Sequence, residues 1–161
     1  MRMRLLTLSA ALLAASCGRD EVIGIGQSIH HDDFEYSVQS LERKDRIGNL
    51  HANGLFYVVT FEVRNGAKQV EHKWSNGIAY VVDRQGRQYE VDAHAQQALA
   101  ATRPFEYKDR YVTPAGATES TVLVFDLPAQ IEDPYLGVRG LFLLGDLKDL
   151  NQYRRKRVRL F

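Results

Sequence analysis

Four consecutive residues near the start of the chain, His30, His31, Asp32 and Asp33, carry side chains that can bind a transition metal. Imidazole nitrogens and carboxylate oxygens are common ligands of such ions. Neighbouring residues of a strand point to opposite sides, so only His30 with Asp32, or His31 with Asp33, can share a ligand set. A closed site would need further ligands from the other histidines, which are His51, His72 and His94. Because aspartate is frequent in turns, we expect a solvated turn and no bound metal, with metal binding as the alternative.

The C-terminus carries the densest group of charges in the chain. Its basic residues are Arg154, Arg155, Lys156, Arg157 and Arg159. If this segment is a strand, the arginines at odd positions share one face, and Val158 and Leu160 share the other. One interpretation is contact with an anionic partner, such as lipid head groups, lipopolysaccharide or acidic glycans. The other, which we expect, is a charged edge strand that prevents edge-to-edge aggregation.

No arrangement of acids, serines and histidines in the sequence singles out a catalytic centre. The phosphate-binding loop, the nucleophile elbow and the zinc-protease motif are all absent from the sequence. We therefore expect a protein that is not an enzyme and uses no cofactor. A net charge of +1, from 21 basic and 20 acidic residues, argues against a nucleic-acid partner.

The single cysteine, Cys17, follows a segment that is typical of bacterial export signals. Arg2 and Arg4 precede an apolar run over residues 5–15, and small residues lead from there to the cysteine. The run is shorter than the roughly 20 residues that a membrane-spanning helix needs. One cysteine also excludes an internal disulfide.

The residues before Cys17, Leu13-Ala14-Ala15-Ser16, resemble a lipobox, at which bacterial lipoproteins are cut before a cysteine that becomes lipidated. They depart from the usual pattern because the leucine lies four residues before the cysteine instead of three. The resemblance implies a signal peptide over 1–16, a lipidated cysteine and tether over 17–26, and a folded domain over 27–161. Gly18 in place of aspartate implies the outer membrane, facing the periplasm or the cell surface. A plain secretory signal is the alternative.

Alternating apolar and polar residues after the tether predict an all-β fold. Strands are predicted within 34–39, 55–65, 78–83, 88–92, 121–127, 138–144 and 153–161. The polar segment 42–54 is predicted to be a loop, and 84–87 a hairpin turn with a positive φ at Gly86. Residues 93–101 predict one short helix. About seven strands with one helical insert predict an immunoglobulin-like antiparallel β-sandwich. Aromatic residues in loop-like segments, either core or an exposed patch, are Trp74, Tyr107 and Tyr111.

Three stretches together resemble the immunoglobulin-like (telokin-like) domain of unknown function found in many bacterial lipoproteins. A Gly-x-Gly opening precedes a strand in 24–38, and a glycine, a strand, an asparagine and Asp-x-x-Gly-x-x-Tyr follow in 54–89. A Pro-x-Gly turn then precedes a strand that ends in Phe-Asp-x-Pro, in 114–128. The resemblance implies a sandwich outside the cytoplasm with no known catalytic residues. The insert 93–111 and the basic C-terminus depart from it.

We therefore expect a lipid-anchored protein of the cell envelope. Its domain would bind an envelope protein or glycan, or would have a structural part. Two alternatives are an envelope hydrolase or metal-dependent enzyme on the same scaffold, and a periplasmic carrier of a metal or another ligand.

Overall fold

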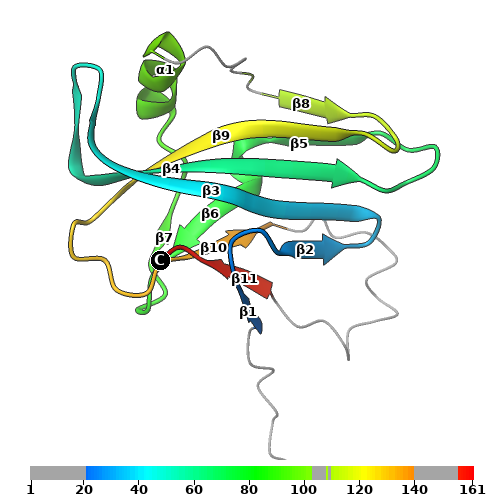
Figure 1. Cartoon of the computed structure of the whole chain (residues 1–161), viewed down its shortest axis with the longest axis horizontal. Helices are drawn as coiled ribbons and strands as arrows, with labels where there is room; N and C mark the ends of the chain where they lie inside the picture. Colours follow the sequence, from blue (N-terminus) through cyan, green and yellow to red (C-terminus); the bar gives the residue numbers. More distant parts are fainter. Residues whose placement is uncertain (1–20, 103–107, 109, 140–155) are drawn as a thin grey trace, which may run out of the picture.

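A computed structural model of the chain describes residues 21–102, 108, 110–139 and 156–161, and these residues form a β-sandwich with one short α-helix (Figure 1). One sheet has the strand order β2-β3-β4-β9, another β1-β11-β10-β6-β7, and a two-stranded ribbon pairs β5 with β8. The elements are β1 (Glu21–Ile23), β2 (Ser28–His31), β3 (Phe34–Ile47), β4 (Leu50–Asn65), β5 (His72–Ser75), the 3-10 helix η1 (Asn76–Ile78), β6 (Ala79–Val82), β7 (Gln88–Tyr89), α1 (Ala93–Thr102), β8 (Arg110–Thr113), β9 (Thr118–Leu127), β10 (Tyr135–Val138) and β11 (Lys156–Arg159). The predicted all-β sandwich with one helical insert is confirmed.

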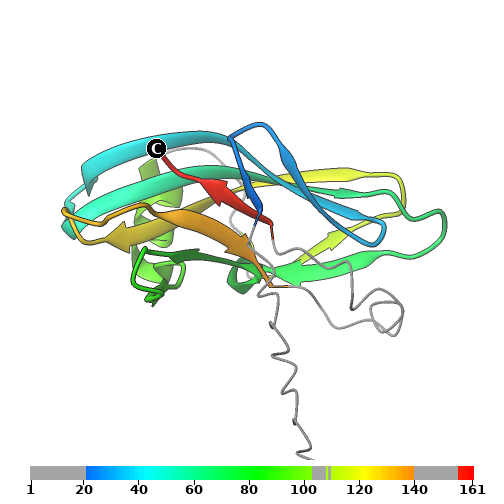
Figure 2. The ribbon, with the colours of Figure 1, turned by 90° about the horizontal axis from the view of Figure 1, so that it is seen from below.

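The long strand β4 is apolar on both sides because both of its faces are covered. Phe61 and its alternate neighbours lie in the main core between the sheets. Phe56 and Val58 face the other way and pack with Leu99 of α1 in a second cluster. Figure 2 shows the sandwich from the side, with the long strands β3 and β4 running together in one layer. The prediction of a central strand over 55–65 is therefore confirmed.

The prediction of a loop over 42–54 was wrong. β3 continues to Ile47 and β4 begins at Leu50, so the segment is the far half of a long hairpin that turns at Gly48, whose φ is 57°. Most of its side chains are polar because this half extends past the sheet edge, and its buried Ile47 packs with α1 instead. A register shift between Val38 and Ser40 marks a β-bulge in the pairing of β3 with β4.

Gly54 is required by a close approach of two chain segments. A Cβ at this position would overlap the carbonyl oxygen of Leu127 and would lie 2.6 Å from the amide nitrogen of Ala129. The Asp126 carboxylate accepts hydrogen bonds from the backbone amides of Asn53, at 2.9 Å, and of Gly54, at 3.2 Å. Gly54 and the Phe-Asp-x-Pro sequence of residues 125–128 thus form the two sides of one contact.

The predicted turn between β6 and β7 is fixed by a buried carboxylate. Gly86 has a φ of 82°, as predicted. Asp83 accepts hydrogen bonds from the amides of Gln85 and Arg87, each at 2.9 Å, and from the Arg87 guanidinium at 2.6 Å. Burial alone would raise the pKa of Asp83, but the hydrogen bonds from Arg87 and Tyr89 hold that pKa below its usual value. The turn is therefore rigid and charged at neutral pH.

The basic strand β11 is not an edge strand, which corrects the sequence-based expectation. It lies between β10 and β1, and its pairing with β1 is parallel. A parallel pair joins segments far apart in the sequence, so strand patterns alone could not have revealed it. Val158 and Leu160 are buried in the core, on the side opposite to Arg159, as the alternation predicted.

Candidate functional site

A cavity of about 440 Å³ lies against the outer face of the β5–β8 ribbon. Its described walls come from both ribbon strands, from Gly77 and Ile78 of η1, and from Arg139 just after β10. The ribbon alternates strictly between buried and exposed residues. Lys73 is paired with Val112, and Ser75 with Arg110, on the exposed side. The ribbon therefore presents two basic residues, one hydroxyl and one apolar side chain to the cavity.

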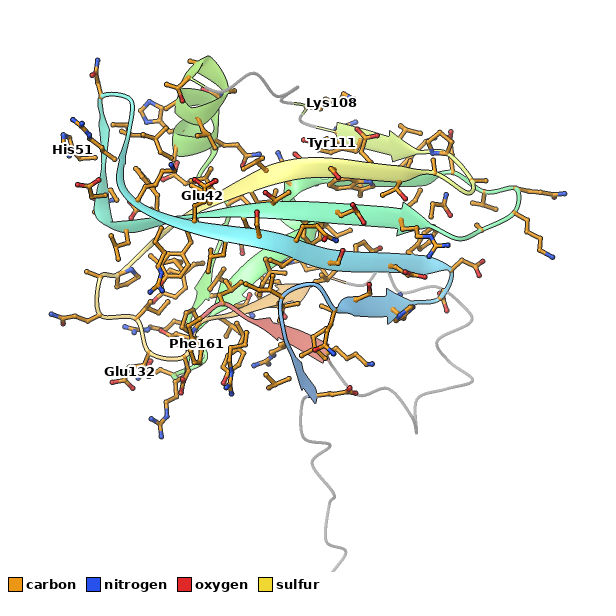
Figure 3. All side chains as sticks on the ribbon, in the orientation of Figure 1. Glu42, His51, Lys108, Tyr111, Glu132 and Phe161 are labelled. Carbon is orange, nitrogen blue, oxygen red and sulfur yellow. The ribbon has the colours of Figure 1, made fainter. Side chains whose placement is uncertain are left out.

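The buried side of the ribbon is fixed to the core by aromatic residues. The rings of Trp74 and Tyr111 stack with centroids 4.1 Å apart and an interplanar angle of 11°. The Trp74 indole donates a hydrogen bond of 2.9 Å to the Thr113 hydroxyl, and the hydroxyl groups of Tyr111 and Thr121 are 2.6 Å apart. An isolated two-stranded ribbon is only marginally stable, so these contacts hold the cavity wall in place. Figure 3 shows Tyr111 beneath β8.

This arrangement decides between the two interpretations of the aromatic residues. Trp74 and Tyr111 are buried, with 6% and 2% of their surface exposed, so they are core residues whose edges line the cavity. Tyr107 lies outside the described residues. The predicted choice between core and exposed patch is therefore settled in favour of the core for two of the three.

Arg110 is the charge at this cavity that other residues neutralise least. Lys73 forms an ion pair of 2.9 Å with Glu71, whose hydrogen bond and charge raise the pKa of Lys73. Arg139 binds both carboxylate oxygens of Glu90. Within the described part of the chain, Arg110 forms no ion pair. Its guanidinium is thus available to an external anion.

Lys73 and Arg110 can act on the same ligand. They are diagonal neighbours on one face of an antiparallel pair, a relation that puts Cβ atoms about 7–8 Å apart and within reach of long side chains. The described lining contains no carboxylate, and Ile78 and Val112 make part of it apolar. Guanidinium and ammonium groups recognise carboxylate and phosphate oxygens. The geometry therefore suits a ligand with an anionic group on an apolar body.

Asn65, at the end of β4, positions the ribbon. Its fully buried amide donates hydrogen bonds to the carbonyl oxygens of Val70, at 2.7 Å, and Thr113, at 3.0 Å, and accepts one from the Ala67 amide at 3.0 Å. Val70 lies just before β5, and Thr113 ends β8. One side chain thus holds both strands of the ribbon at the same end.

The four residues with metal-ligand chemistry are divided between the two sides of the chain. His30 is exposed, 3.8 Å from Glu35, while His31 is buried on the opposite side. Asp32, with a φ of 52°, and Asp33 form the exposed turn between β2 and β3. In the described ranges, no group of three or more His, Cys, Asp or Glu is arranged to hold a metal ion.

His31 instead lies near a buried histidine at the end of the ribbon. The Nε2 atom of His72 is 2.8 Å from the Tyr36 hydroxyl, and the Phe34 ring stacks on the imidazole at 3.9 Å. Burial, and then the nearby His31, lower the pKa of His72. The imidazole is therefore neutral at neutral pH.

Of the other predicted site residues, Lys156, Arg157 and Arg159 lie in β11, and Cys17, Arg154 and Arg155 lie outside the described residues. Sequence reasoning missed the cavity residues Lys73, Arg110 and Arg139 because they are far apart in the chain. For Lys73 and Arg110, the one signal in the sequence was the alternation of inward-facing and outward-facing residues in HKWS (72–75) and RYVT (110–113). Among the described residues, no helix has the length and hydropathy that crossing a membrane requires.

We expect Asn65→Ala to lower the free energy of unfolding by about 3 kcal/mol, because two buried backbone groups and one partly buried one lose their partner. The exposed Asn53→Ala is the control, with a loss of about 1 kcal/mol or less. Trp74 is the only tryptophan, so its fluorescence reports on the ribbon directly. Urea denaturation followed by fluorescence should show a red-shifted native spectrum for Asn65→Ala. An unchanged native spectrum and midpoint would show that the ribbon does not depend on Asn65.

We expect the stability of the protein to fall as the pH drops below about 6.5, the ordinary pKa of histidine. Because the folded state lowers the pKa of His72, the unfolded state binds the proton more readily. The contribution of neutral His72 to the free energy of unfolding is therefore fully present above pH 6.5. Below pH 6.5 it is lost, by at most about 1.4 kcal/mol per pH unit for one proton. His72→Gln should flatten the profile, and the exposed His30→Gln should not. A His72→Gln profile as steep as that of the parent chain would assign the proton to another group.

Comparison with known proteins identifies the fold and nothing more specific. No family model matches the chain, and no curated protein matches it. The secreted protein MPT63 from Mycobacterium tuberculosis has 12% identity and a TM-score of 0.57, and covers 87% of this chain and 97% of its own. The yjhA protein from Bacillus subtilis has 9% identity, a TM-score of 0.58 and coverages of 88% and 99%. An uncharacterised β-sandwich protein from Clostridium difficile has 14% identity, a TM-score of 0.53 and coverages of 89% and 95%. The chain is thus similar to bacterial β-sandwich proteins in fold.

Proposed function

We propose that this chain is a lipid-anchored module of the cell envelope that binds, without catalysis, a partner carrying an anionic group. The observation that carries the proposal is the pair Lys73 and Arg110, side by side on the open face of a rigid ribbon and beside an apolar cavity wall. A site of this kind needs no moving part to recognise a carboxylate or a phosphate. The partner is an envelope protein or an acidic glycan.

Anchoring at Cys17 is supported by the sequence before it. The basic start, the short apolar run and the small residues up to Ser16 form a signal that ends at the only cysteine. Lipid chains contribute roughly 0.8 kcal/mol per buried CH₂, so an acylated cysteine holds the domain firmly. Gly18 after the cysteine supports the outer membrane. MPT63, which has a similar fold, is described as secreted.

A binding role accounts for the cavity better than catalysis does. Ser75 is the aliphatic hydroxyl in its described lining, and neither a histidine nor a carboxylate shares that lining to act as a base. Nucleophilic catalysis requires such a base within hydrogen-bond reach. Two positive side chains next to a lining without histidine or carboxylate favour charge recognition.

Replacing Cys17 tests the anchor. In cells grown with a labelled fatty acid, we expect Cys17→Ala to abolish both labelling of the protein and its recovery with membranes. Ser16→Ala keeps a small residue before the cysteine and should leave both unchanged. Recovery of Cys17→Ala with washed membranes would contradict lipid anchoring.

Neutralising the two basic residues tests the binding site. With inorganic phosphate as the probe, we expect Lys73→Gln/Arg110→Gln to weaken binding about thirtyfold or more, since each of the two charge-assisted contacts contributes roughly 1 kcal/mol or more. Trp74 fluorescence can report the titration because Trp74 is among the residues that line the cavity. Lys44→Gln/Arg46→Gln removes the same charge from the β3–β4 hairpin and is the matched control. Equal phosphate binding by both variants would exclude the cavity as the anion site.

A further inference from the structure

We propose that the β1–β11 edge of the five-stranded sheet lies against the anionic surface of the membrane that holds the lipid anchor. The inference rests on the proposed function in one respect, since it takes Cys17 to carry the lipid. It adds an orientation: one particular side of the domain faces the membrane, and lipid phosphates are what it contacts. We call this side the β1–β11 edge and define it by the exposed residues Val22, Arg159 and Phe161 and by the half-buried Arg157 between them.

The length of the tether limits how far this edge can be from the membrane. β1 begins at Glu21, four residues after Cys17. Four residues in a fully extended chain span at most about 14 Å. Electrostatic attraction between exposed charges extends over a Debye length of about 8–10 Å at ordinary salt concentrations. The start of β1 is therefore held within about two Debye lengths of the membrane surface.

The parallel pairing brings the basic strand to the same place. Glu21 is opposite Lys156, Val22 opposite Arg157 and Ile23 opposite Val158. Because the two strands run in the same direction, β11 begins at the end of the sheet where the tether enters. An antiparallel pair would have put Lys156 at the far end of β1. The basic C-terminus is thus the neighbour of the anchor, although it lies some 140 residues away in the sequence.

The outward side chains of this edge are of the kinds that bind an interface. Val22 and Phe161 are exposed over 46% and 56% of their surface, which is high for large apolar residues. The Arg159 guanidinium lies 4.9 Å from the centroid of the Phe161 ring and 5.9 Å from that of Tyr135. Apolar and aromatic groups next to basic ones are typical of surfaces that insert among lipid head groups. Figure 3 shows Phe161 beside β11 and Tyr111 at β8, on opposite sides of the sandwich.

The charges of the chain favour this orientation over others. β1 and β11 together hold three basic residues and one acidic residue, Glu21, whose carboxylate is 3.5 Å from the Lys156 ammonium group. Outside the signal segment and the C-terminal run, the chain has 14 basic and 20 acidic residues. An anionic surface attracts the β1–β11 edge and repels most of the remaining body.

Binding of the unlipidated protein to vesicles tests the inference. The chain from residue 18 contains every described element and lacks Cys17, so lipidation cannot contribute. We expect it to bind vesicles of phosphatidylcholine with phosphatidylglycerol, and to bind pure phosphatidylcholine vesicles far more weakly. Arg157→Gln/Arg159→Gln should weaken binding roughly twentyfold or more, about fivefold for each charge. Arg157→Lys/Arg159→Lys keeps the charge and should keep most of the binding.

Two controls separate this edge from the rest of the molecule. Lys44→Gln/Arg46→Gln removes the same charge from the hairpin and should leave vesicle binding unchanged. Thermal unfolding of each variant identifies any loss that comes from misfolding. Binding that ignores vesicle charge, or that falls equally for the edge variant and the hairpin variant, would overturn the inference. Failure of Cys17→Ala to release the protein from membranes contradicts the anchor alone, so the two outcomes are distinguishable.

A site-specific probe tests the orientation directly. The chain from residue 18 has no cysteine, so Val22→Cys and Val70→Cys each take a single environment-sensitive fluorophore. Both positions are exposed, and Val70 lies in the loop between β4 and β5. On vesicles with phosphatidylglycerol, we expect increased emission from the label at 22 and none from the label at 70. An increase at 70 without one at 22 would place a different side on the membrane.

Discussion

The side-chain amide of Asn65 is the contact on which the β5–β8 ribbon depends. It is completely buried, and it satisfies the buried backbone groups of Thr113 and Ala67 and the partly buried carbonyl of Val70. A buried carbonyl or amide without a hydrogen-bond partner lowers the free energy of unfolding by about as much as several surface contacts raise it. The end of β4 is further closed by two backbone hydrogen bonds of 2.9 Å, one to Ala117 and one from Gly116. The ribbon strands β5 and β8 therefore leave the sandwich from a single fixed point.

From this point, the alternation of side chains along β5 and β8 determines which residues face the core and which face outwards. Once Asn65 sets where β5 and β8 begin and end, Trp74 and Tyr111 must face inwards and Lys73 and Arg110 outwards. The stacked rings pack against the core and make the ribbon part of it, although it pairs with neither larger sheet. The cavity is therefore a preformed site, because its wall is as rigid as the core that supports it.

The parts of the fold that sequence could predict are those with a local cause. Alternation around Phe61 predicted the central strand, and the same rule put Val158 inside and Arg159 outside. The far half of the β3–β4 hairpin was missed because its polar side chains look like a loop, and its buried Ile47 needs α1, a distant element, to cover it. The neighbours of β11 and the cavity were missed for the same reason. Lys73, Arg110 and Arg139 come to line one cavity only when the chain has folded, and their spacing in the sequence does not predict this.

The two positive regions of the domain have different chemistry, and this difference fits two different partners. At the cavity, Lys73 and Arg110 lie beside the apolar residues Ile78 and Val112, which suits one anionic group on a defined molecule. At the β1–β11 edge, Arg159 and Phe161 are exposed side by side, which suits an extended surface where many anions are equivalent. Tyr111 and Phe161 mark these regions on opposite sides of the sandwich. In the proposed orientation the β1–β11 edge faces the membrane and the cavity stays accessible, and an anionic surface repels the acidic body between them.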